Sequence, residues 1–222
     1  KADGKTVWLS YPLTETTPAY GGGPGMRIVP LTRISQGDTA NTVRLEFPNH
    51  LGTHVDAPAH FFSDAATVDQ YTPDEWLFRT PQLVDVDVES GNLVTRSELP
   101  PVLPRETDLL LLRTGHGSTR GTPIYWEQGP GLSASLARSL REELPRLRAV
   151  GVDLVSITSR LKRKAGREAH RAFLDPTLPG RPLLLIEDMA LQKAPIDLRW
   201  VVGLPLRWAR GDGGPITVLG ST

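Results

Sequence analysis

The feature that most constrains the fold is a succession of short β-rich runs with few helical segments between them. We predict strands at residues 6–11, 26–31, 42–47, 83–88, 108–113, 149–155, 183–187, 200–206 and 216–219. Short runs rich in β-branched and aliphatic residues, bounded by glycine, proline and other turn residues, are typical of strands. Together these runs predict a substantial sheet.

Helical patterns are fewer, and we predict them at residues 72–78, 132–144 and 166–174, with at most one turn at 97–99. The segment 132–144 is the strongest, because Ser133 can cap it and Pro145 ends it. Leu136, Leu140 and Leu144 repeat every four residues on one face. Several strands follow one another without a helix between them. We therefore expect an α/β fold with a mixed, strand-rich sheet and flanking helices, rather than a doubly wound Rossmann fold.

Length and composition fit a single domain spanning residues 1–222. The chain has 25 acidic and 25 basic side chains, so we expect no electrostatic binding to nucleic acid. No run approaches the ~18 apolar residues of a membrane span, and the first residues lack the apolar core of a secretory signal. The chain contains no cysteine, so a metal site would use His, Asp and Glu. We expect a cytoplasmic protein that acts on a small molecule.

Three of the five histidines fall in the segment FPNHLGTHVDAPAHF, residues 47–61. A helix would divide its ionisable side chains between two faces, and a straight strand would spread them over about 33 Å. The segment can bend, because Gly52 is conformationally permissive and Pro58 fixes its own φ. We therefore predict a shaped loop after a strand, in which four side chains converge: His50, His54, Asp56 and His60.

This set of nitrogen and oxygen donors suits Zn²⁺ or Mn²⁺. Mg²⁺ and Ca²⁺ are more easily excluded than Fe²⁺. It is not the helical HExxH site, because Leu51 follows His50 where that motif needs Glu. The alternative is a core histidine, His54, bonded to Asp56, with two unrelated surface histidines. Three histidines and an aspartate around a proline-shaped turn favour the metal site.

The segment HLGTHVDAPAH resembles the HxGTHxDxPxH signature of the metal-dependent cyclase family, which includes bacterial kynurenine formamidases and isatin hydrolases. Similar segments are LSYPLTETTPAY at 9–20, LLLLRTGHG at 109–117, YWEQGPGLS at 125–133, GVDLVSI at 151–157 and LPLRWARGDGGPITVLG at 204–220. The resemblance implies the family's swivelling β/β/α-type domain, with one or two Zn²⁺ ions or alternatively Mn²⁺. It also implies a homodimer or higher assembly, in which residues 12–30 could exchange between subunits.

The resemblance implies roles for the clustered side chains. His50, His54 and Asp56 would hold one metal ion. Asp56 would bridge to a second ion, and His60 would be the acid/base catalyst.

The second metal site would need a distant His and Glu, for which His170 and Glu187 are the candidates. The stretch between them is longer than the family pattern, so Asp188 competes with Glu187 as the ligand. The alternatives are an exposed helical His170 and a Glu187 paired with an arginine.

Four further residues are expected to contact the substrate: Tyr20, Trp126, His116 and Ser156. The two aromatic residues lie in family-like segments, where they either face a substrate or simply pack. His116 lies in a glycine-rich loop, where it faces either substrate or solvent. Ser156 either orients a ligand or satisfies a turn. The basic run at 160–167 is either a solvated face, a rim for a carboxylate-bearing substrate, or a contact for an acidic partner.

The expected reaction is hydrolysis of an amide-like C–N bond, of an arylformamide such as N-formylkynurenine in tryptophan catabolism. One alternative keeps the metal centre and changes the substrate to a cyclic amide, imide or lactone, as in isatin hydrolases. Another is a non-catalytic metal-binding protein that retains the fold.

Overall fold

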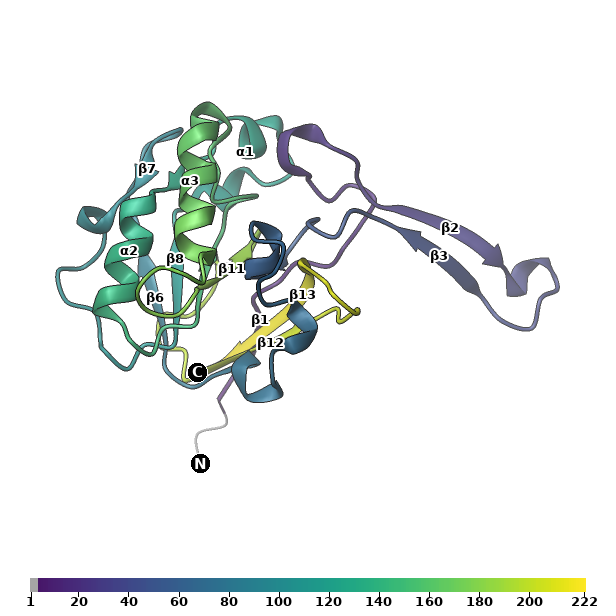
Figure 1. The fold of residues 1–222 in the computed structure, drawn as a ribbon. Coiled ribbons are helices and arrows are strands. Elements are labelled where there is room, and N and C mark those ends of the chain that lie inside the picture. The colour runs from purple at the N-terminus through teal and green to yellow at the C-terminus, as the bar shows by residue number, and fades with distance from the viewer. Residues whose placement is uncertain (1–3) are drawn as a thin grey trace.

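A computed structural model describes residues 4–222 and confirms the mixed α/β architecture (Figure 1). The main sheet has the strand order β5-β12-β13-β4-β11-β10-β8-β6, and β1 also pairs with β13. Its strands are β1 (Thr6–Trp8), β4 (His54–Asp56), β5 (Leu77–Phe78), β6 (Pro81–Asp85), β8 (Leu109–Arg113), β10 (Ala149–Val152), β11 (Leu184–Glu187), β12 (Trp200–Pro205) and β13 (Gly213–Ser221).

One half of the sheet is parallel and is covered by helices. Strands β6, β8, β10 and β11 run parallel, and β8 carries an uninterrupted aliphatic run, LLLL, that is fully buried. Such runs are typical of strands covered on both faces. Helices α2 (Ala134–Glu143) and α3 (Arg163–Leu174) cover one face, and α1 (Pro123–Glu127) is a short helix nearby. The predicted cap is present, because Ser133 Oγ accepts the Leu136 N–H at 3.1 Å.

The other half is antiparallel, and β4 lies between the two halves. It pairs antiparallel with β11 on one side and with β13 on the other. Side chains alternate along a strand. Val55 packs into a core with residues of both halves, including Ile186 and Val218, while His54 and Asp56 face the opposite side. The motif is therefore held at the centre of the sheet.

A buried arginine fixes the stretch between α3 and β11. The Arg141 guanidinium, on α2, donates hydrogen bonds to the carbonyl oxygens of Ala172, Phe173, Asp175, Leu178, Pro179 and Gly180. Burial lowers the pKa of Arg141, and the carbonyls satisfy its donors. The longer connection noted in the sequence is thus wrapped around one side chain, which ties the end of α3 to the start of β11.

Strands β2 (Arg27–Thr32) and β3 (Thr42–Glu46) form a separate antiparallel hairpin that projects from the body as an arm (Figure 1). A further short parallel pair is β7 (Leu93–Val94) with β9 (Gly131–Leu132). The 3₁₀ helices are η1 (Tyr20–Gly22), η2 (Ile34–Gln36), η3 (Pro58–His60), η4 (Val68–Gln70), η5 (Pro73–Trp76), η6 (Arg96–Glu98), η7 (His116–Thr119) and η8 (Arg160–Lys162). Within residues 4–222, no helix has the length and apolar character needed to cross a membrane.

Several predicted elements differ from the structure. The helix expected at 72–78 is wrong: η5 ends at Trp76 and Leu77–Phe78 joins the sheet as β5, pairing with Val201 and Val202. The loop expected for the histidine motif contains strand β4. The strands at 26–31 and 42–47 form the arm rather than part of the main sheet, and α3 begins three residues earlier than predicted, at Arg163.

Candidate metal centre

The bend in the histidine motif has two causes. Gly52 adopts a φ of +68°, and a Cβ there would approach Leu13 Cδ2 to 2.6 Å, so glycine suits the turn before β4. After β4, Ala57 is extended and Pro58 begins η3, which carries His60. The expected roles of the glycine and the proline are therefore confirmed, although a strand lies between them.

Strand β13 lets His50 reach this cluster. Gly213 pairs with Asp56 across the β13–β4 ladder. A Cβ at position 213 would overlap the His50 ring and the Val55 carbonyl oxygen. His50 Nδ1 lies 2.7 Å from Asp56 Oδ1, so this close approach depends on glycine at position 213.

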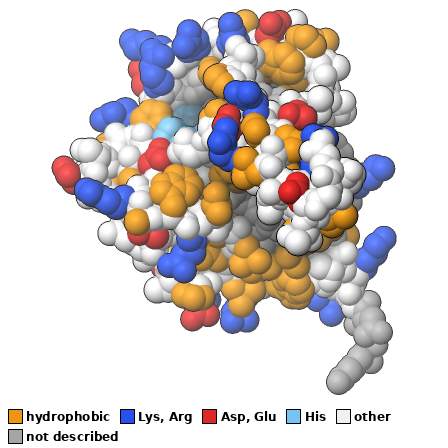
Figure 2. All heavy atoms as spheres, turned by 90° about the vertical axis from the view of Figure 1, so that its right-hand side faces the viewer, with side chains coloured by type: hydrophobic (Ala, Val, Ile, Leu, Met, Phe, Trp, Pro, Cys, Tyr) orange, Lys and Arg blue, Asp and Glu red, His pale blue; other side chains and the backbone are white. Residues whose placement is uncertain are grey.

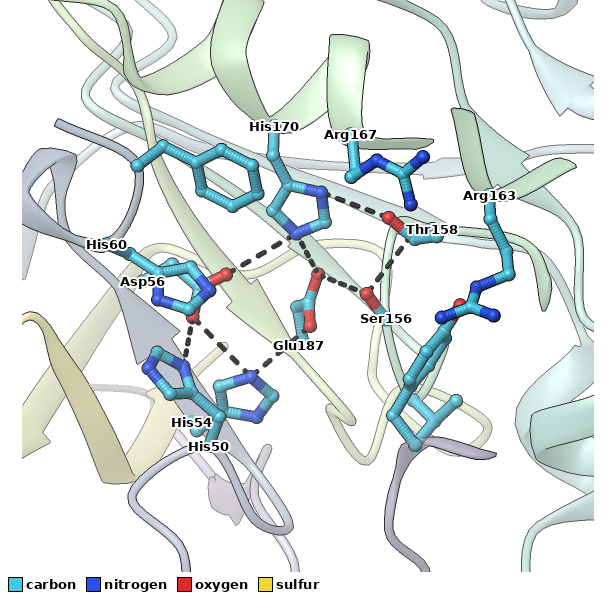
Figure 3. Close-up of a pocket in the computed structure, with 13 residues that line it drawn as sticks. His50, His54, Asp56, His60, Ser156, Thr158, Arg163, Arg167, His170 and Glu187 are labelled. Atoms are coloured by element: carbon cyan, nitrogen blue, oxygen red, sulfur yellow. Dashed lines mark hydrogen bonds and ion pairs between the residues drawn. The ribbon is translucent and has the colours of Figure 1, made fainter. Parts of the chain in front are cut away.

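Glu187 and His170 meet the motif from two other elements. Glu187 ends β11, where its Oε2 lies 3.2 Å from His54 Nε2 and its Oε1 lies 3.3 Å from His170 Nε2. His170 comes from α3, and its Nε2 also lies 3.6 Å from Asp56 Oδ2. Figure 3 shows these four side chains directed at one another. The carboxyl end of a parallel strand is a common location for functional groups in α/β sheets.

Backbone groups fix the orientation of both buried histidines. His54 Nδ1 lies 2.8 Å from the Gly52 carbonyl oxygen, and His170 Nδ1 lies 3.0 Å from that of Gly166. With Nδ1–H donating to a carbonyl, Nε2 is the atom that can bind a metal ion. Glu187 is oriented too, because its Oε1 accepts the Ile157 N–H at 2.7 Å.

The electrostatics of the cluster favour a cation. Burial would raise the pKa of Asp56, but hydrogen bonds from His170 and His50 hold that pKa well below its usual value. Burial and the charge of Asp56 would raise the pKa of Glu187, yet hydrogen bonds from His170 and His54 lower it to about 2. The two carboxylates therefore remain charged, and buried charges need compensation by protonated histidines or by a metal ion.

The donor set fits a divalent cation. In residues 4–222, the donor atoms of each of three groups lie within 4.8 Å of one another: His50, His54 and Asp56; Asp56, His170 and Glu187; His50, His60 and Asp212. Asp56 belongs to two of these groups, and its two oxygens face different histidines. One carboxylate could thus bridge two ions, because it offers two ligand atoms where a neutral imidazole offers one.

Asp212 is the residue that sequence reasoning missed. Its Oδ2 lies 2.9 Å from His60 Nδ1 and 2.9 Å from His50 Nε2, and its Oδ1 accepts the Asn49 side-chain N–H at 2.8 Å. Burial would raise the pKa of Asp212, but the hydrogen bonds from His50 and His60 lower it. The signal was an acidic residue between glycines, GDGG, directly before a predicted strand.

Asp188 faces away from this cluster. Its carboxylate is fully buried and accepts a forked pair of hydrogen bonds from Arg120, at 2.8 and 2.7 Å. The Tyr125 hydroxyl donates to the same carboxylate at 2.6 Å. Asp188 directly follows Glu187 and adopts a φ of +52°. Its carbonyl oxygen accepts the Thr53 hydroxyl at 2.6 Å, so it ties β11 to the histidine motif.

A cavity of about 310 Å³ opens over the cluster. Of the residues expected to contact substrate, Tyr20 and Ser156 line it. His116 stacks on Tyr125 and bonds to its carbonyl oxygen, and Trp126 lies against the η1 loop; neither lines the cavity. The walls also include Phe61, Val155 and Thr158, for which the sequence predicts no role.

Comparison with known proteins places this geometry in a family. Residues 7–159 match the model of the Cyclase family, described as "Putative cyclase". The structure is similar to an isatin hydrolase bound to the product analogue thioisatinate, with a TM-score of 0.82 and 17% identity over 99% of this chain and 93% of that one. It is also similar to a potential metal-dependent hydrolase with cyclase activity, with a TM-score of 0.77 and 22% identity over 98% of each chain.

A third similar structure is isatin hydrolase A from Labrenzia aggregata bound to benzyl benzoate, with a TM-score of 0.77 and 18% identity over 99% of this chain and 94% of that one. At such identities, the structural likeness shows a common fold. The family model covers most of the chain, including the histidine motif. The chain therefore belongs to the Cyclase family.

Proposed function

We propose that the protein is a metal-dependent hydrolase that cleaves an amide-like C–N bond, with an arylformamide such as N-formylkynurenine as its substrate. The observation that carries the proposal is the convergence of His54, Asp56, His170 and Glu187, from three separate elements, below an open cavity. His50 completes the ligand set, because it groups with His54 and Asp56 and its Nδ1 lies 2.7 Å from Asp56 Oδ1. The nitrogen and oxygen donors suit one or two Zn²⁺ ions, with Mn²⁺ as the alternative.

The side chains around the cavity supply the proton transfers. A bound divalent cation would lower the pKa of water and polarise the carbonyl. His60 takes the proton of the attacking water, because Asp212 accepts from its Nδ1 and leaves Nε2 as the base. Water oxygen adds to the formyl carbon, the C–N bond breaks, and His60 returns the proton to the amine nitrogen. The products are formate and the free amine.

The second candidate reaction is ring opening of a cyclic amide. The structural similarity to two isatin hydrolases supports it, and the same metal ligands and the same base would serve. Formate release from N-formylkynurenine, compared with ring opening of isatin by the metal-loaded protein, separates the two. If neither substrate nor any formamide, imide or lactone in a panel is hydrolysed, the hydrolase proposal fails and a non-catalytic metal-binding role replaces it.

We also propose that the protein is a homodimer joined through the arm. A two-stranded hairpin alone is marginally stable in water, yet the arm exposes five large apolar side chains: Ile28, Leu31, Ile34, Val43 and Leu45. A groove at its base is lined by further apolar residues, including Met26, Phe47, Leu204 and Leu206. Figure 2 shows apolar side chains gathered on the face from which the arm projects. A two-fold axis would place the arm of one copy on this face of the other.

Light scattering after size exclusion tests the dimer. The wild-type protein should have twice the mass of one chain, and the double variant Ile34→Glu/Val43→Glu should have the mass of a single chain. Val102→Glu is the matched control, because Val102 is 81% exposed and lies outside the arm. A monomeric wild-type protein, or a double variant that stays dimeric, would contradict this interface.

A further inference from the structure

One stripe of α3 carries both a candidate metal ligand and two arginines. Arg163, Arg167 and His170 are spaced four and three residues apart, so they lie on the same face of the helix. All three line the cavity. Figure 3 shows Arg163 and Arg167 on the side of Ser156 and Thr158, across the cavity from His50 and His54. The cavity therefore has a metal-binding end and a basic end.

The two arginines have no acidic partner. No carboxylate of residues 4–222 forms an ion pair with Arg163 or Arg167, whereas Arg120 pairs with Asp188 and Arg148 pairs with Asp108. The carboxylates that line the cavity are Asp56 and Glu187, and both are engaged by histidines. One divalent cation would balance these two charges. The positive charge of the two guanidinium groups would then remain available to a ligand.

The remaining walls suit an aromatic body. Phe61 stacks on His170, with ring centroids 5.0 Å apart, and Val155 lies in the same cavity. The Tyr20 hydroxyl is buried and lies beside the Arg163 guanidinium at the basic end of the cavity. A hydroxyl in such a position can donate to a ligand oxygen. The volume of about 310 Å³ fits a single small substrate.

We propose that Arg163 and Arg167 bind an anionic group of the substrate, such as a carboxylate, at the end of the cavity away from the bond that is cleaved. Arginine forks match the planar geometry of carboxylates and form their stronger hydrogen bonds. The substrate class is therefore a small aromatic amide that carries a negative charge. This inference rests on the proposed hydrolase function and narrows it to substrates that carry a carboxylate or another anionic group.

The test compares two substrates of the same shape. The metal-loaded protein is assayed with 4-formamidobenzoate, which is anionic, and with 4-formamidobenzamide, which is neutral. The kcat/KM of the anionic substrate should be at least about tenfold higher, which is about 1.4 kcal/mol. The double variant Arg163→Gln/Arg167→Gln should abolish this preference, mainly by raising KM for the anionic substrate, so that kcat/KM falls at least about tenfold more for the anionic substrate than for the neutral one. The same comparison with isatin-5-sulfonate and isatin covers ring opening.

The matched control is Lys164→Gln, which removes one positive charge from an exposed position of α3 outside the cavity and should preserve the preference. Equal kcat/KM for the two substrates, or an equal loss for both in the double variant, would overturn the inference while leaving the hydrolase function intact.

Binding gives a readout that does not depend on catalysis. Titration calorimetry with 4-aminobenzenesulfonate should show binding at least about tenfold weaker in the double variant. Unchanged binding would overturn the inference. If no substrate is hydrolysed but this arginine-dependent binding is present, the hydrolase function fails and the anion site stands.

Discussion

Replacing Asp212 by asparagine should preserve bound metal and remove most of the hydrolysis. The two oxygens of Asp212 accept from opposite sides, Oδ2 from His60 and His50 and Oδ1 from Asn49. An asparagine has one oxygen and one NH₂ group. If the asparagine oxygen faces the histidines, its NH₂ group faces the NH₂ group of Asn49, and the hydrogen bond with Asn49 is lost. If its NH₂ faces His60 Nδ1, the ring proton moves to Nε2, which must accept the proton of the attacking water.

The catalytic effect should exceed the effect on stability. Loss of general acid–base catalysis costs about 10²- to 10⁴-fold in rate, or about 2.7–5.4 kcal/mol. The Asp212 side chain is 37% exposed, so the loss of one charged hydrogen bond should cost about 1.5 kcal/mol, the lower end of the usual range. In a chain of 222 residues, this lowers Tm by roughly 3–6 °C.

The assay is kcat/KM at neutral pH, together with metal content and Tm. Asp64→Asn is the matched control, because Asp64 is an exposed aspartate four residues after His60, and it should behave as wild type. A variant at Asp212 with wild-type kcat/KM would refute the positioning of His60. Loss of metal from this variant would instead indicate that Asp212 is a metal ligand.

Four further predictions concern the cluster and its support. Asp56→Ala should fold but lose most bound metal, because it removes both oxygens of the shared carboxylate; full metal content by elemental analysis would contradict the bridge. In the metal-free protein, burial alone would lower the pKa of His54 and of His170. Their interactions with Asp56 and Glu187 outweigh burial and raise these pKa values to about 9 and about 10. Both are then protonated at neutral pH, so metal affinity should rise towards pH 9 with release of protons, and an affinity independent of pH would exclude them as ligands. The raised pKa values of the two histidines stabilise the metal-free protein, fully below about pH 6.5 and progressively less as pH rises through 9 to 10. The Tm of the chelated protein should therefore be lower at pH 9 than at pH 6.5. Arg120→Ala should cost about 3–5 kcal/mol of unfolding free energy, because it leaves the buried Asp188 carboxylate unpaired; a loss below about 1 kcal/mol in urea denaturation would count against this ion pair.

The fold class could be predicted from the sequence, but the path of the sheet could not. Aliphatic runs such as LLLL on β8 identify parallel strands because both faces are buried. Strand β4 escaped prediction because its three residues include only one apolar side chain, Val55. Helix α3 has no side-chain cap, so its start at Arg163 carried no signal. That β2 and β3 leave the main sheet depends on tertiary packing.

The candidate site was predictable where its residues share a motif or a strand end. His50, His54, Asp56 and His60 lie within one short segment, and Glu187 ends a clear strand. Asp212 was not predicted, because it lies 152 positions from His60 in the chain and only the β13–β4 pairing brings the two together. The two arginines were visible only as a basic run, since the face of α3 that they share with His170 depends on where the helix begins.

The most direct test of the metal centre is a crystal structure of the metal-loaded protein, with anomalous scattering recorded at the absorption edge of the metal. We expect an anomalous peak about 2.0–2.2 Å from His54 Nε2 and from an oxygen of Asp56. If the active, metal-loaded protein shows no peak among His54, Asp56, His170 and Glu187, the metal centre proposed for this chain is contradicted.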